Sequence, residues 1–548
     1  MRRYNLYKCI ALTLFTILFN ACSKDYLERA PSDFIPAEEV FSNIESAEDF
    51  LNNAYNNLPS LFKPGGDQNW VLSSGTDEAE QIWDIAGDAN DFNTGNWNST
   101  SFPLQSFWFN YYNSIRRVNN FIEHYDMIPV DNINPGRKER MLGEAYGLRA
   151  YYYFELMKMW GAVPIVDHVL EPSDPEGTIL TRNSVDEVMA FIKGDVDRAV
   201  SILPARHVQS QFGRFTAMAA KALWSRATLY YASPLLNPGN DQNRWQAAAD
   251  AAKDAIDFAA ANNYVLSTGS VDGFGAYERI FLEQMNAEVL FTRTGMNGGE
   301  YASWDMVLNS NADGGWAGTS PIQEMVDSYE MSNGKMINES GSGYNPQNPY
   351  VDRDPRFYQT VLYQGAMWKG NPMDFRPGGA DLKTDHPPVN YFLRKFMYEP
   401  LNLYNASNTL YRPWILMRLS ELFLNYAEAL NEASGPSDEA YEYINRIRRR
   451  VDMPELTAGL SQEQLREKIR HERRIELAFE DHRFWDVRRW KIGTMVDNKP
   501  IHYVMVNSDG SYSYPEREPR VFQEKHYLFP IPQSEIDKNP QLVQNPGW

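Results

Sequence analysis

Eight residues in two glycine-rich stretches, 63–104 and 295–320, have side chains suited to binding chemistry. They are Trp83, Trp97, Trp304 and Trp316, with Asp77, Asn96, Tyr301 and Asn309 beside them. A sugar ring has apolar C–H faces and hydroxyl groups at its edge, so its site needs flat aromatic faces and a polar rim. The two stretches contain that mixture. They predict a carbohydrate site, and we expect neither a metal nor another cofactor in it.

Three alternatives to a carbohydrate site stay open. Each tryptophan could instead anchor its loop on the rest of the fold, and Trp70 and Trp368 are reserve candidates. Aromatic and acidic surfaces also hold extended peptides. A glycoside hydrolase is a third alternative, because a chain with 72 acidic residues always contains some pair at catalytic separation.

The catalytic and metal motifs that begin in this sequence are not completed. His471-Glu472 starts like a zinc protease helix, but Ile475 stands where the second histidine is needed. Asp352-Arg353-Asp354 starts like a calcium loop, but the glycine and the final glutamate are missing. No Ser/His/Asp signature stands out among the eight histidines. The sequence therefore predicts a binding protein and not an enzyme.

The charge of the chain argues against nucleic acid as a partner. The net charge is −20, and removal of residues 1–21 would take away three basic residues and no acidic one, giving −23. Such a surface repels phosphate backbones, whose affinity for proteins comes largely from basic groups. Aromatic residues make up 14% of the chain, and most of them are expected in its core.

Long helices are expected to position the two stretches. Apolar residues recur at helical spacing in many segments, and Ser184 with Glu187 and Ser461 with Gln464 fit the capping-box pattern. The expected helices cover residues 47–58, 105–126, 137–160, 185–203, 216–233, 243–262, 419–430, 437–451 and 461–480. The pair 216–233 and 243–262 has the helix-turn-helix length of a tetratricopeptide unit, without a clean repeated consensus. We therefore expect a mainly α fold, a degenerate helical-repeat scaffold with long irregular loops.

The N-terminus has the pattern of an export signal. Residues 2–8 carry three basic side chains, and residues 10–19 are largely apolar but too short for a permanent membrane span. The segment 18–22 ends in a small residue followed by Cys22 and resembles the lipobox of bacterial lipoproteins, in which that cysteine is acylated and becomes the first residue. Residues 23–28 resemble a surface-export tag of Bacteroidetes lipoproteins. We expect residues 1–21 to be a signal peptide and Cys22 to be lipidated.

The C-terminal third contains the most recognisable motifs. In order they are Arg418-Leu419-Ser420-Glu421, Asn425-Tyr426-Ala427-Glu428-Ala429-Leu430, Asn445-Arg446-Ile447-Arg448, His471-Glu472-Arg473-Arg474-Ile475-Glu476-Leu477-Ala478-Phe479-Glu480, and His482-Arg483-Phe484-Trp485-Asp486. Upstream landmarks are Glu144-Ala145-Tyr146-Gly147-Leu148-Arg149, Trp160-Gly161-Ala162-Val163-Pro164 and Asp352-Arg353-Asp354-Pro355-Arg356. Their order and spacing resemble those of the SusD/RagB family of Bacteroidetes nutrient-binding lipoproteins.

The resemblance implies one SusD-like domain over residues 22–548, with an N-terminal segment of about 22–235 and a C-terminal segment of about 285–548. It implies a lipid-anchored protein that faces the exterior at the outer membrane. Such a protein captures glycan, or in RagB-like members peptide, and delivers it to a SusC-like TonB-dependent transporter. The helical motifs themselves are expected to be structural, with apolar faces that pack and Arg and Glu residues that bridge helices. A surface-layer scaffold protein that binds no small ligand is the remaining alternative.

Overall fold

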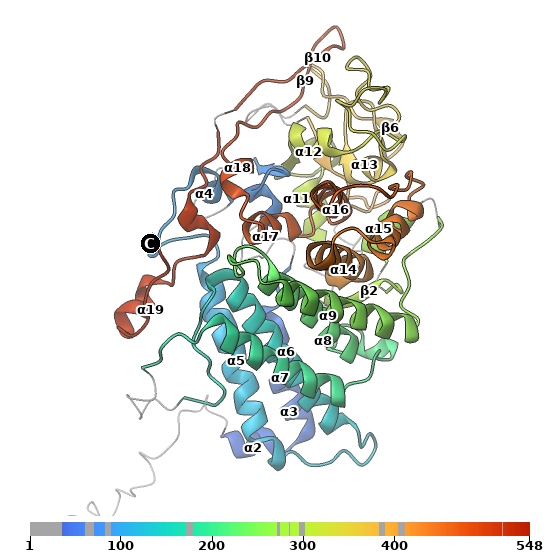
Figure 1. Ribbon diagram of the computed structural model, residues 1–548. Helices are drawn as coiled ribbons and strands as arrows, with labels where there is room; N and C mark the ends of the chain where they lie inside the picture. The colour runs from blue at the N-terminus through green and yellow to red at the C-terminus, as the bar shows by residue number, and fades with distance from the viewer. Residues whose placement is uncertain are drawn as a thin grey trace, which may run out of the picture.

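The computed structural model describes residues 36–60, 71–82, 89–170, 179–270, 274–283, 285–294, 302–382, 390–403, 412–517 and 519–548. Cys22 and the whole N-terminal signal lie outside these ranges. Helices form the lower and right-hand parts of the molecule in Figure 1, and irregular loops with short strands form its top. No helix in the described ranges has both the length and the apolar character needed to cross a membrane.

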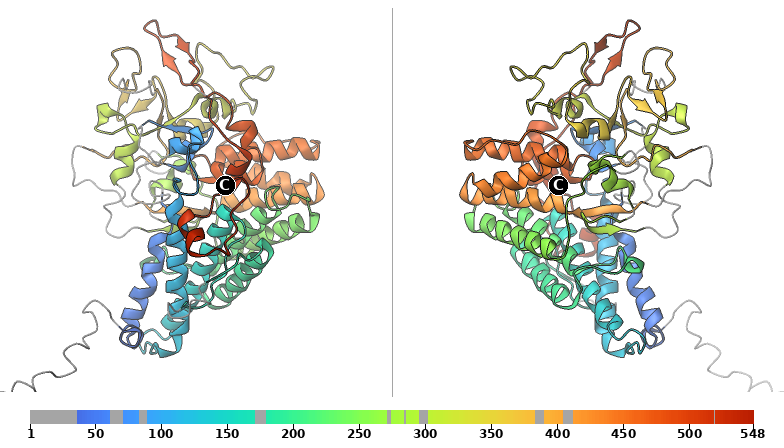
Figure 2. Two further views of the ribbon diagram at one scale, coloured as in Figure 1. Left: turned by 90° about the vertical axis from the view of Figure 1, so that its left-hand side faces the viewer. Right: turned by 90° about the vertical axis from the view of Figure 1, so that its right-hand side faces the viewer.

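The long helices form a layered scaffold of antiparallel neighbours. They are α5 (Gln105–Glu123), α6 (Arg137–Trp160), α7 (Val185–Ile202), α8 (Ala217–Ala232), α9 (Gln242–Ala261), α14 (Leu419–Ser434), α15 (Asp438–Arg450) and α16 (Gln462–Glu476). Successive helices from α5 to α9 pack on one another, α14 packs on α9, and α15 and α16 pack on α14. Figure 2 shows the last three helices lying over α8 and α9. The mainly α prediction is confirmed, and α8 with α9 is the predicted helical hairpin.

Local sequence signals set most helix boundaries. Both predicted capping boxes are present: Ser184 and Ser461 each accept a backbone hydrogen bond from the residue three positions on, whose side chain bonds back. The expected helix 461–480 is shorter than predicted, because α16 ends at Glu476. Phe479 and Asp481 then take left-handed backbone angles, with φ of +62° and +65°, and turn the chain into α17 (His482–Arg489).

The remaining elements are short and lie mostly in the long loops. The helices are α2 (Ala37–Phe41), α3 (Ile44–Asn52), α4 (Ala89–Thr94), α10 (Ala276–Leu282), α11 (Ala302–Leu308), α12 (Gln323–Ser328), α13 (Pro355–Thr360), α18 (Gly493–Val496) and α19 (Gln533–Lys538). Single 3₁₀ turns are η2 (Asn53–Asn57), η3 (Leu72–Gly75), η4 (Tyr125–Met127), η5 (Gln209–Gln211), η6 (Asn311–Asp313) and η7 (Glu524–Tyr527).

The strands of the described ranges pair in twos, and each pair is antiparallel. The pairs are β1 (Ala79–Gln81) with β3 (Thr319–Pro321), β2 (Val289–Arg293) with β8 (Trp414–Arg418), β4 (Val361–Leu362) with β7 (Phe392–Leu393), β5 (Met367–Trp368) with β6 (Asn371–Pro372), and β9 (Met505–Val506) with β10 (Tyr512–Ser513). Three of these pairs join segments far apart in the sequence. They fix the loops to one another and to the scaffold.

One apolar cluster runs through the described residues from Phe41 to Leu542 and contains residues of both the N-terminal and the C-terminal segments. At one point the packing requires glycine: a Cβ on Gly147 of α6 would lie 2.3 Å from the ring of Phe215, just before α8. A second, smaller cluster fills the space between α14, α15 and α16. The N-terminal and C-terminal segments therefore share a core.

Many charged residues of the C-terminal motifs form buried ion pairs, as predicted. Arg418, with 1% of its side chain exposed, lies 2.9 Å from Glu288, 2.6 Å from Glu476 and 2.7 Å from Glu480. The Nε of Arg473 lies 2.7 Å from a carboxylate oxygen of Asp486. A buried charge is tolerated only when it is paired and hydrogen-bonded. These residues hold the scaffold together from its interior.

Candidate functional site

The pairing of β1 with β3 joins the two aromatic loops that the sequence analysis singled out. Ala79 faces Pro321 and Gln81 faces Thr319 across the pair. The backbone N–H of Ile82 continues the ladder, donating to the carbonyl of Gly318 at 3.0 Å. Trp83 directly follows Ile82 in the sequence, and Gly318 lies two residues after Trp316. Two stretches about 240 residues apart in sequence therefore meet at one place.

Among the predicted tryptophans that lie in the described residues, Trp316 is open to solvent, with 43% of its surface exposed. Its backbone N–H donates to the carbonyl of Met306 at 2.7 Å, which ties the loop to α11. Gly315 is needed beside it, because a Cβ there would lie 2.4 Å from the carbonyl oxygen of Asn309. Backbone hydrogen bonds and close packing therefore fix the position of the loop that carries the Trp316 indole.

The β5–β6 hairpin contacts the same loop through Asp313, three residues before Trp316. The Nε1 of Trp368, on β5, donates to Asp313 Oδ2 at 2.7 Å, and Lys369 Nζ lies 3.3 Å from the same oxygen. The Asp313 and Lys369 side chains are 27% and 22% exposed, whereas Trp368 is 4% exposed. The reserve candidate Trp368 thus supports the loop. Sequence reasoning missed Asp313 and Lys369, although Asp313 lies within the glycine-rich stretch 295–320.

Two other predicted tryptophans are buried at 3% exposure each. The Trp97 ring packs against Trp548, His526 and Phe529, with centroid distances of 4.5, 4.7 and 5.3 Å. The Trp304 ring lies edge-on to Trp414 at 5.8 Å. Both rings are enclosed by other side chains, as expected for residues that anchor their loops on the rest of the fold. Neither offers an open face in this structure.

The predicted polar residues are scattered. Asp77 makes a two-pronged ion pair with Arg483, at 2.7 and 2.8 Å, and lies 3.2 Å from Arg474. Burial alone would raise the pKa of Asp77, but the two guanidinium groups hold it well below its usual range. Asn309 is 1% exposed, and its side-chain oxygen accepts from the N–H of Ser310 at 2.9 Å.

Among the remaining predicted residues, Asn96 is exposed to solvent. Trp83, Tyr301 and the reserve Trp70 lie outside the described residues, so their ligand roles stay predictions. Of the eight predicted residues, the structure therefore leaves Trp316 and Asn96 open to solvent. It places Asp77 and Asn309 in structural contacts.

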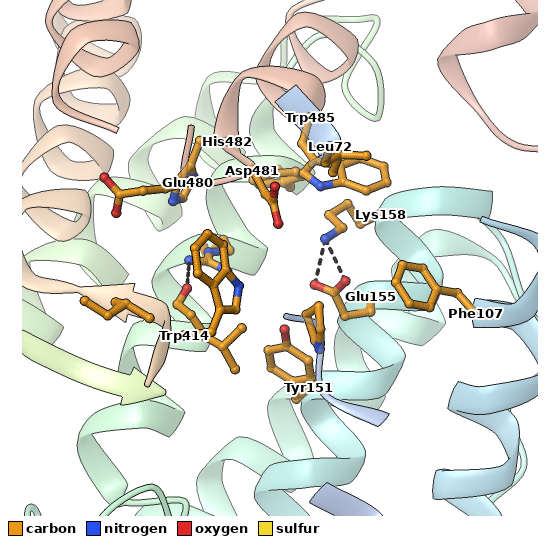
Figure 3. Close-up of a pocket in the computed structure, with 15 residues that line it drawn as sticks. Leu72, Phe107, Tyr151, Glu155, Lys158, Trp414, Glu480, Asp481, His482 and Trp485 are labelled. Carbon is orange, nitrogen blue, oxygen red and sulfur yellow. Dashed lines mark hydrogen bonds and ion pairs between the residues drawn. The ribbon is translucent and has the colours of Figure 1, made fainter. Parts of the chain in front are cut away.

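A small cavity lined by both aromatic and charged side chains lies between α6, β8 and the α16–α17 turn (Figure 3). Lys158 Nζ bonds both carboxylate oxygens of Glu155 at 2.7 Å and lies 4.2 Å from the Trp485 ring. Burial raises the pKa of Asp481, which also lines the cavity, to about 8. The cavity has a volume of about 50 Å³, whereas ligand pockets measure roughly 300–1,000 Å³. It is too small for a sugar ring and belongs to the interior of the scaffold.

Comparison with known families agrees with the motif order. The family model described as the SusD family matches residues 280–548, and a second, described as starch-binding associating with outer membrane, matches residues 25–229. The chain is a member of the SusD family. The resemblance seen in the sequence is confirmed, and the two matched ranges contain all eight predicted site residues.

Relatives of this SusD family member align along nearly its whole length. SusD-like protein P2 of Formosa agariphila is 26% identical, over 98% of this chain and 99% of its own. A crystal structure of a SusD-like protein from Bacteroides fragilis has a TM-score of 0.80 and 28% identity, covering 95% of this chain and all of its own. Another from that organism, titled a SusD-like carbohydrate-binding protein, has a TM-score of 0.77 and 25% identity, covering 92% and 100%.

Proposed function

We propose that this protein binds a glycan at the face that displays Trp316, without cleaving it, and passes it to a SusC-like TonB-dependent transporter in the outer membrane. The observation that carries the proposal is the β1–β3 pairing, which brings both aromatic loops to one place and leaves the Trp316 indole exposed. The family model that names starch binding and the outer membrane, and the Bacteroides fragilis carbohydrate-binding relative, support it.

The chemistry around Trp316 suits a sugar. An indole face can cover the apolar side of a pyranose ring, and the Asp313 carboxylate with the Lys369 ammonium can bond its hydroxyl groups. Trp83, Tyr301 and Asn96 are proposed as further contacts on the same pair of loops. The other predicted residues are proposed to support this face indirectly, because they anchor the loops that form it. They are Trp97, Trp304, Asp77 and Asn309.

Affinity electrophoresis against a panel of polysaccharides, with a reducing-sugar assay on the same mixtures, tests binding and cleavage together. We expect retardation in at least one gel and no release of reducing ends. Released reducing ends would assign the protein to the glycoside hydrolases. Binding of extended peptides with no glycan retarded would favour the RagB-like alternative instead.

Anchoring and delivery need their own experiment. We propose that Cys22 carries the lipid, so a Cys22→Ser chain should leave the membrane fraction, and labelled palmitate should enter only the unchanged chain. Pull-down of the lipidated protein should recover one large outer-membrane barrel protein. Recovery of many copies of this chain alone would favour a surface-layer scaffold.

A further inference from the structure

A second pocket, of about 300 Å³, lies on the helical scaffold and shares no lining residue with the Trp316 loop. Its walls are the end of α3 with η2, the turn after η5, and the end of β2. Its lining includes Asn52, Gln211, Phe212, Arg293 and Thr294. Its volume is at the lower end of the range for ligand pockets and six times that of the cavity at Asp481.

The walls of this pocket are tied to the scaffold by hydrogen bonds. Arg293 Nη1 donates to the carbonyl of Leu58 at 2.6 Å, joining the end of β2 to the residue after η2. The hydroxyl of Tyr55 donates to Glu144 at 3.1 Å and accepts from the N–H of Phe215 at 3.0 Å. The pocket therefore has fixed walls from three segments, and its shape is set before a ligand arrives.

Glycine lets the η5 turn approach β2 closely. Gly213 has a φ of +90°, which favours glycine, and a Cβ there would lie 2.4 Å from the methyl carbon of Thr294. The turn brings Gln211 and Phe212 beside the strand end for this reason. A larger residue at position 213 would push the two walls apart.

The polar groups of the pocket are mostly neutral, and several are unused. The side-chain amides of Asn52 and Gln211 and the hydroxyl of Thr294 make no hydrogen bond within the described ranges. Arg214 is occupied by Glu48 at 2.8 Å and Glu144 at 2.9 Å, so its charge is already balanced.

Amides and hydroxyls both donate and accept hydrogen bonds, as the hydroxyl groups of a sugar do. A strongly anionic ligand would find Arg293 as its main cation in a chain of net charge −20. An apolar ligand would leave the two amides without partners. A neutral sugar ring, with one face on Phe212, satisfies these groups best.

We propose that this pocket is a second carbohydrate-binding site, which holds one neutral sugar unit through Asn52, Gln211, Arg293 and Thr294. The proposal rests on the proposed glycan-binding function and adds a site to it. Asn52 at the end of α3 and Gln211 in η5 offer hydrogen-bonding groups from two different segments, Arg293 donates from the end of β2, and Phe212 provides the apolar contact.

Hydrogen–deuterium exchange of the full chain with maltohexaose, cellohexaose, laminarihexaose and xylohexaose tests this site. At least one sugar should protect segments 50–58, 209–214 and 290–293. This protection should persist in a Trp316→Ala chain, where any protection of 302–321 is weakened. The double variant Asn52→Ala, Gln211→Ala should need about ten times more sugar to protect the three pocket segments. A tenfold change is expected for two lost hydrogen bonds.

Gln209→Ala is the matched control, because Gln209 lies in the same turn, is exposed and does not line the pocket. It should leave the protection unchanged. Protection confined to 302–321, or unaffected by the double variant, overturns the second site and leaves the proposed function intact. If none of the four sugars or the polysaccharide panel binds, the proposed function fails and the second site fails with it.

Discussion

Asp481 should make the protein less stable as the pH rises from about 4 to 8. Its carboxyl group lies in the wall of the cavity shown in Figure 3, and burial raises its pKa from 3.8 to about 8. Lys158 opposes this shift, and the carboxylates of Glu155, Glu78 and Glu480 add to it. The folded protein therefore keeps Asp481 neutral at neutral pH, while the unfolded chain ionises it.

The sign follows from proton counting. Between the unfolded and folded pKa values the folded state binds one more proton, so the free energy of unfolding falls by about 1.4 kcal/mol per pH unit. Asp481→Asn removes this titration, and asparagine accepts the left-handed backbone with φ of +65° found there. Relative to the unchanged chain, the variant should gain roughly 3 kcal/mol in free energy of unfolding between about pH 5 and pH 7.

Urea unfolding followed by tryptophan fluorescence, at several pH values, measures this difference. All other groups are present in both proteins, so the difference between the two curves reports Asp481. Asp77→Asn is the control of opposite sign. Asp77 has a lowered pKa, so its variant should be less stable at neutral pH, and the gap should close as the pH falls below about 4. A constant gap between Asp481→Asn and the unchanged chain from pH 5 to pH 7 would refute the reasoning.

Three further substitutions separate binding from stability. Trp316→Ala should weaken glycan binding by about tenfold in affinity electrophoresis, with an unchanged unfolding midpoint, because the exposed indole supports little of the core. Trp97→Ala should lower the free energy of unfolding by about 3–5 kcal/mol, because it removes one ring from a buried aromatic cluster and leaves a cavity. A loss of glycan affinity with unchanged stability would contradict the anchoring role of Trp97. Arg418→Met should destabilise by about 3–5 kcal/mol, since it leaves Glu288, Glu476 and Glu480 buried without this partner. Stability equal to that of the unchanged chain would show that the remaining cations compensate.

The helical scaffold could be predicted because its signals are local. The capping boxes at Ser184 and Ser461 and the helical spacing of apolar residues act within a few positions of the chain, and they gave helices close to those observed. The end of α16 could not be predicted this way. Phe479 and Asp481 take left-handed backbone angles there. Neither is a glycine, so no residue type in this segment predicts the turn.

The sequence by itself determined the family, the mainly α scaffold and the two loops rich in tryptophan, glycine and asparagine. Only the tertiary structure decided which of these tryptophans face solvent. Trp97 is covered by Trp548 and Trp304 by Trp414, partners that lie 451 and 110 residues away along the chain. The pairing of β1 with β3 likewise joins distant segments. Burial is a property of what packs against a side chain, so residue type and spacing cannot fix it until the whole core is assembled.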